Sequence, residues 1–328
     1  MHHVPTVLAN IDSFFKAVDK FFSSLANVNW AALAIGMLCF GGFLTMRSRA
    51  CFNVLRAAYP GERFKWRGIW GAYVAAYGVN NVFPVRAGNL VRLFLTRSSV
   101  PNSSYPAVAS SFLVDNIFDL TVAVPTLIFA FTQGVFPKPP DFSKLNAFDL
   151  SYLASHPRFT LFLLTVLGVA AVALFAFLSV RVQAFWARVR QGLTILSDRR
   201  RYLREVVALQ AVGWLFRFAA FWFLLDAFHV GGSVRNVMLV YGVTAVSSLV
   251  PLTPGGAGVQ QALLVQVFAG TATGATVAAY SVGQQIAIAA FSAGLGFAAL
   301  VLIFRIRSFK EVIRLGREDQ RAAEAAAQ

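Results

Sequence analysis

The stretch NNVFPVRAG, residues 80–88, and the stretch SSLVPLTPGGAG, residues 247–258, decide how this chain folds. Each begins with two small polar residues at the end of an apolar run, and each continues through a proline into a glycine-containing turn. Proline ends a helix because it lacks an N–H group and clashes with the preceding turn. The two stretches therefore predict two apolar helices that are broken in the same way, with polar residues at the break.

The composition is that of a membrane protein. The 328 residues are 57% hydrophobic and 13% charged, with a mean hydropathy of +0.63, whereas about a quarter of a soluble domain is charged. Full spans, which need about 20 apolar residues to cross a bilayer, are expected at 29–46, 106–135, 159–180, 206–229 and 275–304. The apolar runs are continuous rather than alternating, which excludes a transmembrane β-barrel. We expect an all-α polytopic membrane protein with about five full transmembrane helices.

The placement of the basic residues predicts the topology. The net charge is +15, and most of the 29 lysines and arginines lie in 47–67, 181–204 and 305–321. Such clusters face the cytoplasm, so nucleic acid is not an expected partner. All three clusters lie inside only if 68–97 enters from the cytoplasm and returns, while 236–270 enters from outside and returns. We therefore expect two re-entrant helical hairpins of opposite orientation. The alternative, that proline and glycine only kink two ordinary helices, stays open.

This topology gives a multi-pass protein of the cell's inner (plasma) membrane, with the N-terminus outside and the C-terminus in the cytoplasm. Three regions are expected: an amphipathic interfacial helix at 1–28, a single transmembrane domain at 29–305, and a basic, alanine-rich cytoplasmic tail at 306–328. Opposed broken helices at matching places in two halves are an inverted repeat, the pattern of transporters with a midplane site. A homo-oligomer is left open.

Five charged residues are expected at membrane depth, where a charge faces a cavity or a partner. Arg86 and Arg92 follow the first break, and arginine suits a phosphate, so we expect them to hold an anionic headgroup. Asp115 and Asp119 lie four residues apart on one helix face and are expected to form ion pairs with Arg86 and Arg92 or, alternatively, to carry protons. Arg217 is expected to contact the substrate, with a pair to either aspartate as the alternative. If all five share one cavity, one positive charge remains for an anion.

Uncharged residues at the two breaks complete the candidate substrate site. Exposed N–H groups at a helix start attract anions, and glycine lets the backbone approach a ligand closely. Tight helix packing is the alternative explanation for the glycines. The residues are Asn80, Asn81, Asn89, Pro254, Gly255, Gly256, Gly258 and Gln261.

Motifs of catalysis are missing from the sequence. HExxH, CxxC, GxSxG and P-loop patterns do not occur, so we expect no metal, no cofactor and no catalytic residue. Two alternatives to transport stay open. One is a membrane-embedded lipid-modifying enzyme, or an accessory subunit of a lipid glycosyltransferase, with Asp115 and Asp119 as base or metal ligands. The other is a scaffold whose basic loops bind anionic lipid surfaces.

Three segments carry a resemblance to a known family: NNVFPVRAGNLVR at 80–92, SFLVDNIFDL at 111–120 and PLTPGGAGVQQALL at 251–264. They resemble signatures of the flippase-like membrane family that includes the transmembrane region of lysylphosphatidylglycerol synthases. The resemblance covers roughly residues 7–305. It implies a protein that moves a lipid between leaflets, with the broken segments around the headgroup. The residues it carries over are Pro84, Arg86, Gly88, Arg92, Asp119, Pro254, Gly255, Gly256 and Gly258.

This chain departs from the family pattern at several charged positions. Asn89 and Gln261 stand where the family has glutamate, and Asp115 and Asn116 replace a Glu-Arg pair. These changes make the cavity more positive and put proton coupling through those sites in doubt. The aminoacyl-transfer domain of the full synthases is not found among these residues, so lipid aminoacylation is not expected. We expect a flippase for an anionic lipid, either a phospholipid, a polyprenyl-phosphate-linked lipid or a glycolipid.

Overall fold

The computed structural model describes residues 27–82, 87–133, 183–248 and 259–306, together with residues 314, 315 and 318. Across these ranges the chain is helical and contains no strand, which confirms the all-α class. The interfacial helix expected at 1–28, the span expected at 159–180 and the tail at 306–328 lie wholly or almost wholly outside the described residues.

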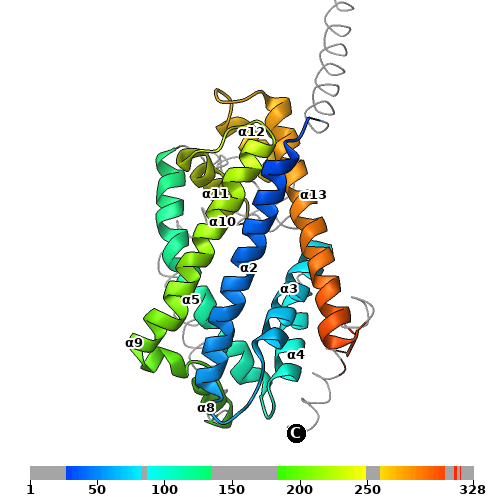
Figure 1. Cartoon of the computed structure of the whole chain (residues 1–328). Coiled ribbons are helices and arrows are strands. Elements are labelled where there is room, and N and C mark those ends of the chain that lie inside the picture. The colour runs from blue at the N-terminus through cyan, green and yellow to red at the C-terminus, as the bar shows by residue number, and fades with distance from the viewer. Residues whose placement is uncertain are drawn as a thin grey trace, which may run out of the picture.

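Four long helical segments form the body of the described structure, and they run along its long direction in Figure 1. Each is long and apolar enough to cross a membrane, as expected for a multi-pass membrane protein. Two of them include one turn of π-helix, η3 and η5. The segments are α2 (Trp30–Ala58), α5 (Tyr105–Thr132), α9–η3–α10 (Arg199–Tyr202, Leu203–Val207, Ala208–Ala227) and α13–η5 (Gly274–Ala299, Leu300–Phe304).

Helix α2 corrects one expectation. The first span was expected to end at residue 46, because the arginines that follow were assigned to a cytoplasmic loop. The helix instead continues to Ala58 and ends where the N–H of Tyr59 donates to the carbonyl of Leu55 at 2.9 Å. Arg47 is therefore a residue of the bundle interior, only 5% exposed. The hydropathy of the sequence places the end of this span too early, because an arginine counts as polar even where it is buried and paired with a carboxylate.

The first broken segment is a pair of antiparallel helices, α3 (Trp66–Val82) and α4 (Gly88–Ser99). At one end the N–H of Gly88 donates to Oδ1 of Asn80 at 2.8 Å. At the other end a Cβ on Gly68 would lie 2.8 Å from Oγ of Ser99. Their 17 and 12 residues rise about 25 Å and about 18 Å, which is short of a bilayer core of about 30 Å. Residues 83–86 lie outside the described ranges.

The second broken segment contains α11 (Val234–Ser248) and α12 (Val259–Val267). The two helices touch where Nε2 of Gln260 donates to Oγ1 of Thr244 at 3.4 Å. In Figure 1, α11 and α12 lie at the end of the bundle where α2 begins, whereas α3 and α4 lie in the half where α2 ends. The two pairs therefore occupy opposite halves of the bundle.

Small residues bring the long helices close enough for their polar side chains to meet. A Cβ on Gly36 of α2 would lie 3.2 Å from the carbonyl oxygen of Ala220 in α10, and one on Gly213 would lie 3.6 Å from Cγ of Arg47. Glycine at such contacts lets membrane helices approach backbone to backbone. Along the chain, α8 (Gln183–Gly192) and the short η2 (Thr194–Ser197) precede α9.

Candidate functional site

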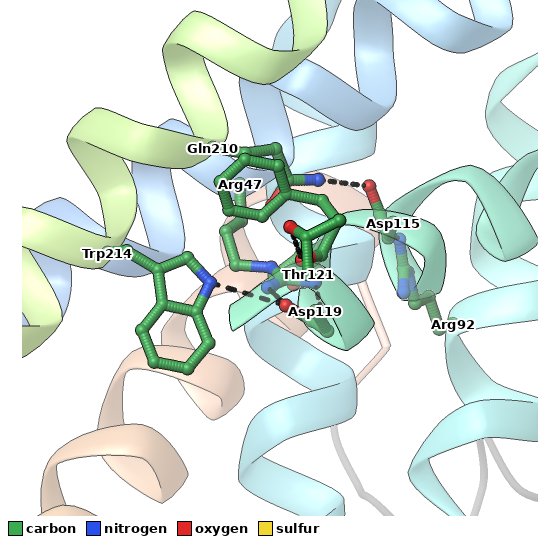
Figure 2. A network of polar contacts seen from close by, with 9 residues as sticks. Arg47, Arg92, Asp115, Asp119, Thr121, Gln210 and Trp214 are labelled. Carbon is green, nitrogen blue, oxygen red and sulfur yellow. Dashed lines mark hydrogen bonds and ion pairs between the residues drawn. The ribbon is translucent and has the colours of Figure 1, made fainter. Parts of the chain in front are cut away.

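Two ion pairs lie between helices of the bundle, both made by aspartates of α5 (Figure 2); the side chain of Asp119 is 38% exposed. Nη2 of Arg92, from α4, lies 2.6 Å from Oδ2 of Asp115, and these side chains are 16% and 2% exposed. Both guanidinium Nη atoms of Arg47, from α2, donate to the carboxylate of Asp119, one of them at 2.9 Å. A buried charge is tolerated only with such a partner, so each pair compensates the charges that the sequence places at membrane depth.

A neutral side chain of α10 bonds to each of the two aspartates. Nε2 of Gln210 donates to Oδ1 of Asp115 at 2.8 Å, and the indole N–H of Trp214 donates to Oδ1 of Asp119 at 3.3 Å. Both residues come from α10 and point toward α5 in Figure 2. The network therefore connects α2, α4, α5 and α10.

Tyr73 of α3 links the pairs from a fifth helix. Its hydroxyl accepts a hydrogen bond from Nε of Arg47 at 2.9 Å. Its ring lies under the guanidinium of Arg92, with 4.5 Å from the guanidinium carbon to the ring centroid. Phe112 lies on the same guanidinium at 3.8 Å. Arg92 is thus held by a carboxylate and two aromatic rings, which makes it part of the helix packing.

The structure differs from the sequence expectation in how the charges are distributed. Asp115 pairs with Arg92, one of the two expected partners, but Asp119 pairs with Arg47, which was expected in a cytoplasmic loop. Arg86 lies outside the described residues. A signal for Arg47 was present, because no proline or glycine interrupts the sequence between it and Pro60. Because this run contains no helix-breaking residue, α2 continues past Arg47 and places that arginine inside the bundle.

Arg217 of α10 is surrounded by aromatic rings instead of a carboxylate. It is half-buried, and in the part of the chain that the structure describes it makes no ion pair, so the alternative of a pair with Asp115 or Asp119 is wrong. Such rings attract a cation through their faces. The distances from the guanidinium carbon to the ring centroids are 4.7 Å for Trp214, 5.3 Å for Tyr241, 5.4 Å for Phe43 and 5.9 Å for Phe221.

The charge balance of this interior follows directly. Arg47 and Arg92 pair with the two aspartates of α5, whereas Arg217 has no carboxylate partner in the part of the chain that the structure describes. Trp214 lies between the two environments, because its ring faces Arg217 and its N–H donates to Asp119. The described interior therefore holds a neutral network, with Arg217 beside it as a cation that has no carboxylate partner among the described residues.

At the first break, two asparagines hold the helices together. Asn80 accepts the N–H of Gly88, and Nδ2 of Asn81 donates to Oγ of Ser292, on α13, at 3.0 Å. Both asparagines are exposed, as is Asn89. Their expected contact with a ligand stays a prediction.

At the second break, glutamines bond to the same helix. Nε2 of Gln261 donates to Oε1 of Gln285 at 3.3 Å, and Nε2 of Gln285 donates to Oε1 of Gln260 at 3.3 Å. Helix α13 thus receives polar contacts from both broken segments, at Ser292 and at Gln285, which are about 10 Å apart by helical rise. Pro84, Pro254, Gly255, Gly256 and Gly258 lie outside the described residues.

Within the described ranges, no three histidine, cysteine, aspartate or glutamate side chains come together in a group that could hold a metal ion. A comparison with protein-family models matches residues 13–296 to the lysylphosphatidylglycerol synthase TM region. No curated protein and no solved structure matches the chain. The family match covers both broken segments and all of the residues of the polar network.

Proposed function

We propose that this chain, which belongs to the family of the lysylphosphatidylglycerol synthase transmembrane region, moves an anionic lipid between the leaflets of a cell membrane. The family supports a link to lipid metabolism. The proposal that the transported lipid is an anion rests on Arg217, a cation without a carboxylate partner among the described residues.

Arg217 lies deep in its helix. It is 18 residues after Arg199 and 10 residues before Ala227, the ends of that candidate span, which places it about 27 Å and about 15 Å from them. An arginine at this depth is costly unless it faces a partner. A lipid phosphate would supply the missing negative charge, and the planar fork of arginine binds two phosphate oxygens at once. The aromatic rings around it would face the apolar part of the same ligand.

We further propose that α3–α4 and α11–α12 are re-entrant hairpins that open to opposite faces of the membrane. Their short helices, their places in opposite halves of the bundle and their polar contacts with α13 support this arrangement. Broken backbone at membrane depth is stable only where protein or a cavity covers it, and opposed broken helices are typical of midplane transport sites. The headgroup would bind between the two breaks, beside Arg217.

Labelling of introduced cysteines tests the topology. Gly61→Cys and Ser98→Cys lie on the chain before α3 and at the end of α4, and Gly270→Cys lies after α12; all three positions are exposed. With a membrane-impermeant maleimide we expect residues 61 and 98 to react from one side and residue 270 from the other. The unsubstituted chain, which retains Cys39 and Cys51, gives the background. Reaction of residues 61 and 98 from opposite sides would make α3–α4 an ordinary crossing.

Leaflet exchange in reconstituted liposomes tests the function. The probes are fluorescent phosphatidylglycerol, a polyprenyl phosphate and an acidic glycolipid, with zwitterionic phosphatidylcholine for comparison. We expect Arg217→Gln to reduce exchange of the anionic substrate at least about tenfold, the effect of about 1.4 kcal/mol. Arg235→Gln is the matched control, because it removes the same charge from an exposed position on α11, and it should keep wild-type exchange. Equal exchange by both variants for every probe would refute the proposal.

The ion pairs bear on the enzymatic alternative. Each aspartate of α5 is bonded by an arginine and by one neutral donor, Gln210 for Asp115 and Trp214 for Asp119. We therefore propose that Asp115 and Asp119 hold the helices in place instead of acting as a base or as metal ligands. Asp119→Asn should accordingly alter the stability of the protein more strongly than it alters any chemical conversion of a bound lipid.

A further inference from the structure

Two further arginines lie on one stripe of α2, close to the end of that helix. Arg49, Phe52 and Arg56 are spaced i, i+3 and i+7, so their side chains leave the helix on one face. The guanidinium carbon of Arg49 lies 5.0 Å from the centroid of the Phe52 ring, and that of Arg56 lies 5.8 Å from the same centroid. Arg49 is half-buried and Arg56 is exposed. In the described part of the chain neither arginine forms an ion pair.

The segment that links α2 to α3 packs aromatic side chains against this stripe. From residue 61 to residue 66, exposed and half-buried positions alternate, as they do where successive side chains of an extended backbone point to opposite sides. The ring of the half-buried Phe64 lies 5.3 Å from that of Phe52, centroid to centroid. The ring of the half-buried Trp66 lies 5.5 Å from the guanidinium carbon of Arg49. Arg49, Phe52, Arg56, Phe64 and Trp66 therefore form one connected group, the basic–aromatic patch.

Positive charge dominates around the basic–aromatic patch. Residues 48–67 contain one acidic residue, Glu62, and its carboxylate accepts a hydrogen bond from Nδ2 of Asn102 at 3.0 Å. Ring faces attract the guanidinium groups of the patch but carry no net charge that could neutralise them. The linking segment adds further exposed basic side chains, which are Arg63, Lys65 and Arg67. An anion would therefore bind the patch favourably.

The depth of the patch matches the level of lipid phosphates. Helix α2 has 29 residues and a length of about 43 Å, which is the thickness of a bilayer with its headgroups, about 40–45 Å around a core of about 30 Å. Arg56 is two residues before the end of α2 and lies at headgroup level. Arg49 is about 14 Å from that end, just inside the core, and an arginine there extends its guanidinium toward the interface.

We propose that the basic–aromatic patch binds the headgroup of one anionic phospholipid from the adjacent leaflet. The guanidinium groups of Arg49 and Arg56 would donate to the phosphate oxygens, and the aromatic rings would contact the glycerol and the first acyl carbons. A zwitterionic lipid fits less well, because its own cation would meet the excess positive charge.

This site is separate from the one proposed at Arg217. Arg49 comes six residues after Phe43, whose ring contacts Arg217, and is about 9 Å further along α2 and about 120° around it. If the chain moves an anionic lipid between leaflets, as proposed above, the patch would hold that lipid in one leaflet before it reaches Arg217. That role rests on the proposed function, whereas the binding itself does not.

Thermal unfolding of the full chain in detergent tests the patch. The background is the Arg217→Gln variant, so that a lipid at Arg217 does not contribute. The additions are phosphatidylglycerol, phosphatidylcholine or inorganic phosphate, at equal ionic strength. We expect phosphatidylglycerol to raise the Tm saturably, on the order of 5 °C at a concentration roughly a hundredfold above Kd. Phosphatidylcholine and inorganic phosphate should give a much smaller rise.

Substitutions on the same background locate the binding. Arg49→Gln and Arg56→Gln should each remove most of the rise caused by phosphatidylglycerol. The matched control is Arg199→Gln, which removes the same charge from an exposed position on α9 and should keep the rise. The readout is the difference in Tm with and without lipid, so it holds even if a variant is less stable. Arg56 is exposed, so Arg56→Gln is the variant expected to fold without loss.

Three results would overturn this site. Equal effects of phosphatidylglycerol and phosphatidylcholine would show that the patch does not select an anionic lipid. An equal rise with inorganic phosphate would show that it binds a free anion instead of a lipid. Equal losses in Arg49→Gln, Arg56→Gln and Arg199→Gln would show that only diffuse surface charge acts. None of these results depends on leaflet exchange, so the failure of this site and the failure of lipid transport at Arg217 are distinguishable.

Discussion

Breaking the ion pair between Arg92 and Asp115 should destabilise the protein far more than removing both charges. The carboxylate of Asp115 is 2% exposed, and among the described residues its donors are Arg92 at 2.6 Å and Gln210 at 2.8 Å. Arg92→Met leaves that carboxylate buried with a single neutral donor. Loss of one partner of a buried pair costs about 3–5 kcal/mol, whereas apolar replacement of both partners is often close to neutral.

The magnitude of the coupling follows from the geometry. Two unit charges about 4 Å apart at an effective dielectric constant of about 20 attract by about 4 kcal/mol. We therefore expect a coupling energy of about 2–4 kcal/mol between Arg92→Met and Asp115→Leu. At about 2–4 °C per kcal/mol, each single variant should lose on the order of 10 °C in Tm, and the double variant should recover most of it.

The assay is thermal unfolding of the four proteins of this double-mutant cycle in one detergent, followed by lipid exchange in liposomes. The double variant Arg92→Met/Asp115→Leu should also retain exchange, because the structure makes Arg92 a part of the packing. Additive effects of the two substitutions, within about 0.5 kcal/mol, would show that the pair is not formed. A stable double variant without exchange would return Arg92 to the substrate site.

Two further predictions concern the packing around the site. Gly88→Ala should lower the Tm, because the added Cβ would lie 2.2 Å from the carbonyl oxygen of Ala76 and overpacking forces the helices apart. The expected loss in unfolding free energy is about 2 kcal/mol or more. Gly61→Ala is the control and should leave the Tm unchanged, because a Cβ there meets nothing within 4 Å. Trp214→Phe removes the hydrogen bond to Asp119 and keeps an aromatic ring near Arg217, so we expect a loss of about 0.5–1.5 kcal/mol in unfolding free energy with lipid exchange retained; a large loss of exchange would mean that the indole N–H acts on the ligand.

Much of the fold follows from local features of the sequence. Apolar runs near Trp30, Tyr105 and Gly274 are long enough to cross a bilayer, and this depends only on composition and length. The breaks near Asn80 and Ser247 lie close to the ends of α3 and α11, because proline acts on the helix immediately before it. The membrane class and the positions of the broken helices were therefore accessible without a structure.

The partners of the buried charges were decided only by the tertiary structure. Arg47 and Asp119 are 72 residues apart, and Gln210 is 95 residues from Asp115. No local pattern in the sequence relates residues at such separations. Judged by hydropathy, the first span ends before Arg47, so Arg47 was not considered as a partner. Asp119 was therefore expected to pair with other arginines. The sequence by itself predicted one arginine in excess only on the condition that Arg86, Arg92, Arg217, Asp115 and Asp119 share one cavity. Only the packing of α2 and α10 around α5 decided that Asp119 pairs with Arg47 and that Arg217 has no carboxylate partner among the described residues, because a charge is neutralised by whichever opposite charge the folded backbone brings within hydrogen-bond distance.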